Sequence, residues 1–284
     1  MLTNQSNKLE TRLGPIAWQS SGEGPPLVFF AGALANHELW RDVVGALDDR
    51  YRCITIDLPL GAHSWPLGPE ADRSASSLSR LILDCLELLD LEDATVVAND
   101  TAGGLVLLSL ASGHPGLDRV GRLVLTNCES YEKFPPDELK KATAMSRRFP
   151  RLAGAGMRLQ LRFAGRAIAS SVAANGLDRE RQESFFGPGR GDPRVAEDLI
   201  ALTASFRPQL LLDAAKAIPE FERPVLLVWG DSCKFFPIED ARRLASDFPQ
   251  ATLLAVPGAK TWVPVDNPGA LVDAILQFVP VPVA

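Results

Sequence analysis

The sequence predicts an α/β fold in which a mostly parallel, doubly wound sheet carries a helical cap. Two observations support this prediction. Short apolar runs alternate with helical patterns along most of the chain, and one long segment, residues 131–220, contains helical patterns only. Strands that alternate with helices normally pair in parallel through right-handed crossovers.

Six short apolar runs end in turn residues, and we expect each to be a strand buried on both faces of the sheet. They are residues 26–32, 51–59, 94–100, 121–129, 224–231 and 252–258. Five helical patterns lie among them, and they are expected to cover the sheet. These are residues 36–47, 74–89, 102–112, 238–248 and 268–279.

Residues 131–220 interrupt this alternation between two expected core strands. We therefore expect a core domain formed by residues 1–130 and 221–284, with 131–220 inserted as a helical cap over the strand ends. The insertion holds 15 Lys/Arg and 11 Asp/Glu, a charge of +4 in a chain of −6. A solvated helix surface explains this excess better than a site for an anionic substrate.

Composition excludes several classes of function. The charge of −6 gives no basic surface for nucleic acid, and no apolar run approaches the ~20 residues that cross a bilayer. We expect a soluble, cytoplasmic protein without a membrane partner. The four cysteines lack disulfide or metal-binding spacing, and no nucleotide motif occurs, so neither metal nor cofactor is expected. A homodimer stays open.

The segment "ANDTAG" (98–103) carries the reactive group that we expect. A strand runs directly into a helix there, and the small residues Ala98 and Ala102 flank Asp100 on either side. This is the pattern of a nucleophile elbow, which projects its central side chain over the sheet edge. The backbone N–H of Thr101 would then be an oxyanion donor.

Four further segments extend this pattern along the chain: "FFAGALANHELW", "DLPLGAHSWP", "VWGDSCKFFP" and "VPGAKTWVPVDNP". With them the chain resembles α/β-hydrolase fold proteins, in the branch of haloalkane dehalogenases and epoxide hydrolases that use an aspartate nucleophile. The resemblance implies an α/β-hydrolase fold. It also implies an ester formed on Asp100, and oxyanion donors from Thr101 and from Ala33 or Leu34.

The same resemblance implies a histidine base and a supporting acid, and the sequence departs from both. The base position holds Thr261 and the acid position holds Cys233, so the triad is degenerate. Glu129 matches an alternative place for the acid.

The accessory groups of both relatives are missing as well. Positions that bind halide in dehalogenases hold Ala33 and Thr101, and Tyr131 is the one tyrosine placed to reach an epoxide.

Two histidines could substitute for the base. His63 follows the run 51–59 and His37 follows the run 26–32, so both are expected at the edge of the sheet where ligands bind. Each has an alternative role in holding loop structure. Trp65 and Trp262 are expected to shape the pocket.

Three functions stay open. In the favoured one, Asp100 acts as a general acid and base on a hydrophobic small molecule, in a cyclisation, isomerisation, elimination or epoxide opening that fits secondary metabolism. In the second, Asp100 forms an ester and His63 or His37 activates water. In the third, the protein binds a ligand without catalysis. A carboxylate in an apolar pocket has a raised pKa, which favours the first.

Overall fold

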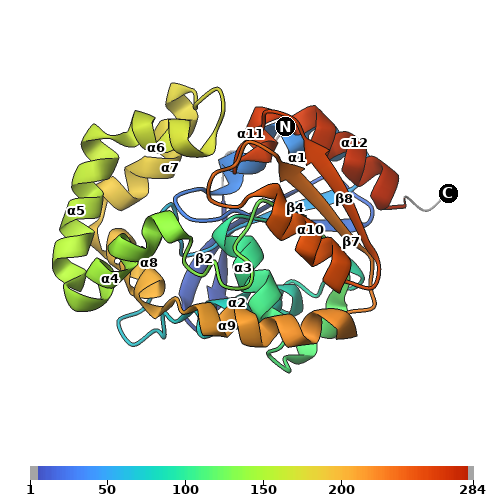
Figure 1. Ribbon diagram of the computed structural model, residues 1–284, viewed down its shortest axis with the longest axis horizontal. Helices are drawn as coiled ribbons and strands as arrows, with labels where there is room; N and C mark the ends of the chain where they lie inside the picture. The colour runs from blue at the N-terminus through green and yellow to red at the C-terminus, as the bar shows by residue number, and fades with distance from the viewer. Residues whose placement is uncertain (1–5, 281–284) are drawn as a thin grey trace.

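The computed structural model, which describes residues 6–280, contains a mostly parallel eight-stranded sheet with helices on both faces (Figure 1). The strand order is β1-β2-β4-β3-β5-β6-β7-β8. Neighbours from β4 to β8 pair in parallel, whereas β1 and β2 are antiparallel. The predicted fold class is confirmed. The strands are β1 Asn7–Thr11, β2 Gly14–Ser21, β3 Pro26–Phe30, β4 Arg52–Asp57, β5 Ala94–Asn99, β6 Val120–Thr126, β7 Val225–Gly230 and β8 Ala251–Val256.

All six predicted strands form, but the sequence patterns missed the hairpin of β1 and β2. Strand β1 is polar and largely exposed at the sheet edge, and β2 is only half-buried. A search for continuous apolar runs detects strands covered on both faces, so it passes over such a hairpin.

Alternate residues of the central strands supply two cores, one on each face of the sheet. On β5, Val96 packs on one side and Val97 on the other. Helices α2 (Ala75–Leu88), α3 (Thr101–Ser109) and α10 (Ile238–Asp247) cover the first face. Helices α1 (Arg41–Leu47), α11 (Val263–Asp266) and α12 (Pro268–Phe278) cover the second.

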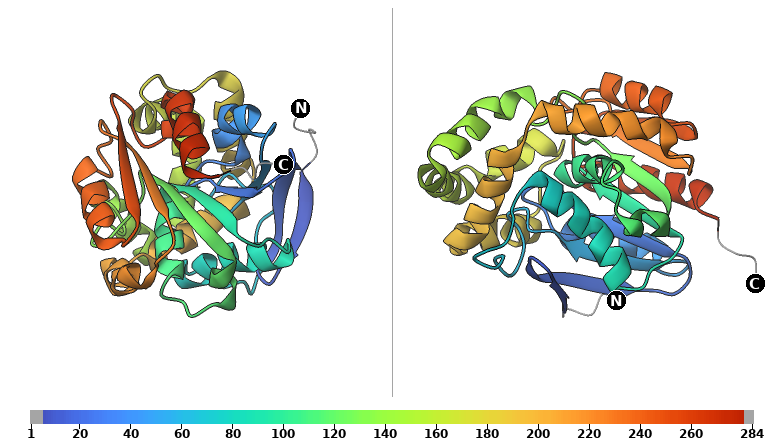
Figure 2. Two further views of the ribbon diagram at one scale, coloured as in Figure 1. Left: turned by 90° about the vertical axis from the view of Figure 1, so that its right-hand side faces the viewer. Right: turned by 90° about the horizontal axis from the view of Figure 1, so that it is seen from below.

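Between β6 and β7 the chain forms helices and no strand, as the pattern of residues 131–220 predicts. They are α4 Lys140–Arg148, α5 Pro150–Phe163, α6 Gly165–Val172, α7 Arg179–Gly191, α8 Pro193–Ser205 and α9 Pro208–Ala214. Helices α4 to α8 stand to one side of the sheet, whereas α9 packs against α3 (Figure 1; Figure 2, right). The division into a core domain and an inserted cap at residues 131 and 220 stays a prediction. Within the described part of the chain, no helix has the length and apolar character to cross a bilayer.

Candidate active site

Asp100 lies at the turn between β5 and α3, in a conformation that presents its side chain above the sheet. Its φ of 53° and ψ of −132° fall in a region that L-residues rarely adopt. The backbone holds this geometry because the Asp100 N–H donates to Asn127 O at 2.9 Å and buried Ala98 and Ala102 let strand and helix approach. Strain of this kind concentrates at functional sites.

The Asp100 carboxylate is anchored through one of its oxygens. The backbone N–H of Ala33 donates to Oδ2 at 2.9 Å. Gly32 makes this approach feasible, because a Cβ at Gly32 would lie 2.5 Å from both Cβ and Oδ2 of Asp100. The amide expected to stabilise a substrate oxyanion is therefore engaged with the carboxylate itself.

Burial and hydrogen bonding act on Asp100 in opposite directions. Desolvation raises its pKa to about 6, although hydrogen bonds from the Thr101 and Ala33 amides lower the pKa and offset part of the effect. Desolvation is the larger influence because a buried carboxylate loses its hydration shell. The group can therefore donate or accept a proton close to neutral pH.

Asp100 faces a cavity of about 590 Å³ between the sheet edge and the cap. The lining is mostly apolar and comes from core residues such as Phe236 and Trp262 and from cap residues such as Met157 and Phe206. Among the described residues that line it, the ionisable ones are Asp100 and Glu129, with no histidine, lysine or arginine. The cavity can hold a small apolar molecule against a carboxyl pair.

Glu129 lies beside the elbow, as the sequence suggested for an alternative acid. The Thr101 hydroxyl donates to its Oε1 at 2.9 Å, while its Oε2 is buried without a hydrogen-bond partner among the described residues. Desolvation, followed by the charge of Asp100, raises the pKa of Glu129 well above its usual range. Glu129 therefore holds its proton more tightly than an exposed glutamate does.

The resemblance places the base at Thr261 and the acid at Cys233, and these two side chains form a hydrogen bond with each other. Cys233 Sγ and Thr261 Oγ1 are 3.1 Å apart, and both side chains are buried. Burial raises the pKa of the Cys233 thiol despite its hydrogen bond with Thr261. Asn99 Nδ2 donates to the carbonyl of Thr261 at 2.7 Å, which ties this loop to the end of β5. Neither side chain can serve as a general base near neutral pH.

His63 does not lie where a substitute base is needed, and the structure corrects that expectation. Its Nδ1 accepts the Gly61 N–H at 3.2 Å, so Nε2 carries the ring proton and donates to Asp198 Oδ2 at 3.1 Å. Asp198, on α8, also accepts from Arg73 at 2.6 Å. The Nδ1 bond holds His63 within its own loop, and the Nε2 bond ties this loop to the cap. The ring does not line the cavity.

His37 also lies outside the cavity. Its Nδ1 is 2.9 Å from Asp57 Oδ2, and the ring lines a separate surface depression beside α7. Burial opposes its protonation, but the hydrogen bond and charge of Asp57 and the charge of Glu38 outweigh burial and raise the pKa of His37. The structure therefore brings no described imidazole to Asp100.

Three further predicted positions differ from expectation. The Leu34 amide donates to Leu60 O at 2.8 Å, so it is not a free oxyanion donor. Tyr131 donates its hydroxyl to Asp247 at 2.6 Å and does not line the cavity, so it cannot polarise an epoxide there. Trp65 lies near Lys8 and does not line the cavity.

Trp262 does line the cavity as expected, and it packs edge-on against Phe185 of α7. Sequence reasoning missed Gly32 and the cap residues that line the cavity. The glycine that ends the apolar run 26–32 was a usable signal for Gly32. No local pattern marked the cap residues, because tertiary packing determines which side of each cap helix is turned towards the cavity.

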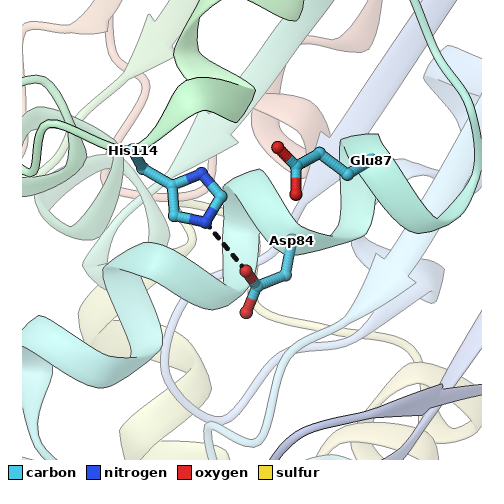
Figure 3. Close-up of side chains that lie close together, drawn as sticks. All are labelled: Asp84, Glu87 and His114. Atoms are coloured by element: carbon cyan, nitrogen blue, oxygen red, sulfur yellow. Dashed lines mark hydrogen bonds and ion pairs between the residues drawn. The ribbon is translucent and has the colours of Figure 1, made fainter.

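A cluster of Asp84, Glu87 and His114 is the one group among the described residues that could hold a metal ion (Figure 3). It lies where α2 ends and before β6 begins, at the sheet edge opposite Asp100. Two of its members already pair with each other: His114 Nε2 is 3.0 Å from Asp84, which also accepts from Arg12 at 2.7 Å. The bonds of Asp84 and His114 are explained as an ion-pair network.

An aspartate on a strained strand-to-helix turn, held by a backbone amide beneath a helical cap, is the arrangement of hydrolase-type enzymes with an aspartate elbow. Comparison with known proteins agrees. The model of the alpha/beta hydrolase fold family matches residues 25–268, and the chain belongs to that family.

Its relatives lie in the haloalkane dehalogenase and epoxide hydrolase branch, as the sequence motifs indicated. Haloalkane dehalogenase 2 of Mycobacterium tuberculosis is 26% identical over 96% of this chain and 94% of its own length. The cis-3-alkyl-4-alkyloxetan-2-one decarboxylase of Xanthomonas campestris is 28% identical over 95% and 94%. The structure of the epoxide hydrolase CorEH superposes with a TM-score of 0.80 at 18% identity, covering 98% of both chains.

Proposed function

We propose that this protein is an enzyme that acts on an uncharged, largely apolar small molecule and uses Asp100 as general acid and base in a reaction that consumes no water. The observation that carries the proposal is the cavity lining. Asp100 faces an apolar space in which the described residues place a second carboxyl group but no imidazole.

The state of Asp100 suits proton transfer. With a pKa of about 6, most molecules carry the carboxylate at pH 7 and a substantial minority carry the acid. A catalytic group works best when its pKa lies near the working pH. The Ala33 amide fixes Oδ2 and so sets the orientation in which the carboxylate meets the substrate.

The same lining indicates the class of substrate and reaction. No cation among the described lining residues could pair with an anionic ligand, and the walls are predominantly apolar. A proton that Asp100 removes at one atom can be returned at another, which describes isomerisation, elimination or cyclisation. Opening of an epoxide by a nucleophile within the same molecule needs the same proton transfer, because the nucleophile loses a proton and the epoxide oxygen gains one. No atom is added from water.

A relative supports chemistry of this kind on the scaffold. The 28% identical protein of Xanthomonas campestris is named for decarboxylation of an oxetan-2-one, an uncharged ring that carries two alkyl groups. Its name denotes loss of carbon dioxide and not hydrolysis.

Two-step hydrolysis is the weaker candidate. An ester on Asp100 needs a positioned base, and such a base contributes about 10²–10⁴-fold to rate. Thr261 and Cys233 are bonded to each other, and His63 is held by Asp198 outside the cavity. Binding without catalysis is weaker still, because a purely structural role gives no reason for a strained, desolvated carboxylate facing the cavity.

We assign the activity to the cytoplasm. All four cysteines are buried, unpaired thiols, and disulfides are rare in reducing compartments. Detection of the protein in an oxidised, exported fraction would contradict this assignment.

The test is proton transfer itself. The full chain is incubated in D₂O with a panel of alkyl ketones, epoxides and oxetan-2-ones, and each compound is followed by NMR and mass spectrometry. We expect at least one compound to exchange a C–H proton or to rearrange. Asp100→Asn should slow this reaction by about 10²–10⁴-fold, and Thr261→Val is the matched control in the adjacent loop.

A parallel incubation in oxygen-18 water separates the alternatives. Products free of the label agree with the proposal. Label in the product during sustained turnover would establish hydrolysis, and an added mass on Asp100 would establish the ester intermediate; either would refute the proposal. Tight binding across the panel with no exchange or conversion would leave a binding protein, and full activity of Asp100→Asn would also refute the proposal.

A further inference from the structure

The outer cap helices carry an unusual charge. From Lys140 to Val172, which spans α4 to α6, the sequence contains eight Lys/Arg and no Asp/Glu. Among the described residues, only Lys140 of these eight forms an ion pair, with Asp137. The rest of the chain therefore carries a net charge of −14, whereas this segment carries +8.

The same segment exposes large apolar side chains. Of the eight exposed large hydrophobic residues in the described chain, six lie between Leu139 and Phe163. On α5, Leu152, Leu159 and Phe163 follow one another at helical spacing, and their exposed fractions are 63%, 60% and 75%. They form an apolar stripe about 16 Å long, at 1.5 Å per residue.

Basic side chains flank this stripe. Arg151 and Arg162 directly precede Leu152 and Phe163 in sequence, and the Arg162 guanidinium lies 5.5 Å from the ring centre of Phe163. Helix α5 packs on α7 and α8 by its other side and forms the outer edge of the cap (Figure 1; Figure 2, right). A basic helix with an exposed apolar stripe is the pattern of a segment that lies on a membrane surface.

The exposed face is continuous with the entrance of the cavity. Leu139, Met145 and Leu152 are exposed to solvent and also line the cavity in which Asp100 lies. The opening therefore lies between α4 and α5, within the basic and apolar surface. A molecule dissolved in an apolar phase against this face would meet the cavity without crossing water.

We infer that α4 and α5 dock on an anionic lipid bilayer, with the α5 stripe in the headgroup region and the surrounding arginines on lipid phosphates. Charge complementarity selects this occupant. A second copy of the chain that docked through the same face would place one +8 surface against another, which is unfavourable. The earlier expectation of no membrane partner considered only membrane-spanning segments. Supply of substrate from the bilayer rests on the proposed function, whereas the docking itself does not.

The test is flotation of the full chain with phosphatidylcholine vesicles, with or without about 30% phosphatidylglycerol. We expect binding to the anionic vesicles only, and weaker binding as salt rises from about 0.05 to about 0.5 M. Arg151→Gln/Arg162→Gln/Arg166→Gln should weaken binding by about 100-fold, at about fivefold for each arginine near the surface. Leu159→Ser/Phe163→Ser should weaken binding at least tenfold.

The matched control is Leu88→Ser, at the end of α2, where the side chain is 51% exposed but lies outside the cap. It should bind vesicles as the unchanged protein does, and circular dichroism confirms that each variant is folded. Four results would overturn the proposal: no binding to either vesicle, equal salt-independent binding to both, a dimer that the α5 variants abolish, or binding to an acidic carrier protein but not to vesicles. None depends on turnover.

Discussion

Replacing Asp100 by asparagine should stabilise the protein at neutral pH but not in acid. Asparagine keeps an oxygen for the Ala33 N–H and tolerates a positive φ, so the change mainly removes the ionisable proton. In the folded protein the pKa of Asp100 is raised from 3.8 to about 6. The folded state therefore binds this proton more tightly than the unfolded chain does.

The sign and size of this stability difference follow from the linkage between proton binding and folding. Stability falls as pH rises from about 3, where both states are largely protonated, through about 6, where the folded state ionises. The loss is about 3 kcal/mol, from roughly two pKa units at 1.36 kcal/mol each. Because the variant has no such group, its advantage over the unchanged protein should grow from near zero at pH 3 to about 3 kcal/mol above pH 7.

Urea denaturation of both proteins at several pH values measures this difference directly. Asp273→Asn, on the exposed side of α12, controls for the loss of one negative charge. A difference that is the same at pH 4 and pH 7, or that favours the unchanged protein at pH 7, would refute the assigned state of Asp100.

Three other substitutions test the surroundings of the carboxylate. Gly32→Ala should push Asp100 off its amide, raise the pKa of Asp100 as followed by carbon-13 NMR of the carboxyl group, and cost about 1–3 kcal/mol in urea unfolding. His63→Phe should cost about 1–3 kcal/mol, because it leaves the buried partner carboxylate short of a donor, yet leave the Asp100 titration unchanged. Thr261→Val should cost at most about 1 kcal/mol through the lost Cys233 bond, with no change in reaction rate.

Each of these has a clear contrary result. Gly45→Ala, on α1 with open space around the added methyl group, is the control for Gly32→Ala and should not alter Asp100. A shift in the Asp100 titration in His63→Phe would return His63 to the site. A large loss of rate in Thr261→Val would show that the hydroxyl takes part in the reaction.

The sequence predicted the parts of the fold that depend on local pattern. The buried parallel strands and the elbow at Asp100 are encoded in short stretches, since apolar runs and small flanking residues act on their own neighbourhood. The β1–β2 hairpin was missed because an exposed edge strand needs no continuous apolar run.

The environment of the histidines could not be predicted in this way. His63 is held by Asp198, which lies 135 positions later, in the cap. The sequence around residue 63 contains no pattern that indicates this partner. His37 is similarly fixed by Asp57 from the next strand. Because each histidine follows a strand, the sequence predicted correctly that both lie at the carboxyl-end edge of the sheet. The orientation of each ring depends on a carboxylate from a distant part of the chain.

The bond from Asn99 to the Thr261 carbonyl bears on how this scaffold changes during evolution. It is the main chain of the last loop, and not the side chain at position 261, that is tied to β5. A lineage can therefore exchange the residue at 261 while the loop keeps its place beside the elbow. A change of the side chain at position 261 can therefore alter the chemistry of the site while the fold stays the same.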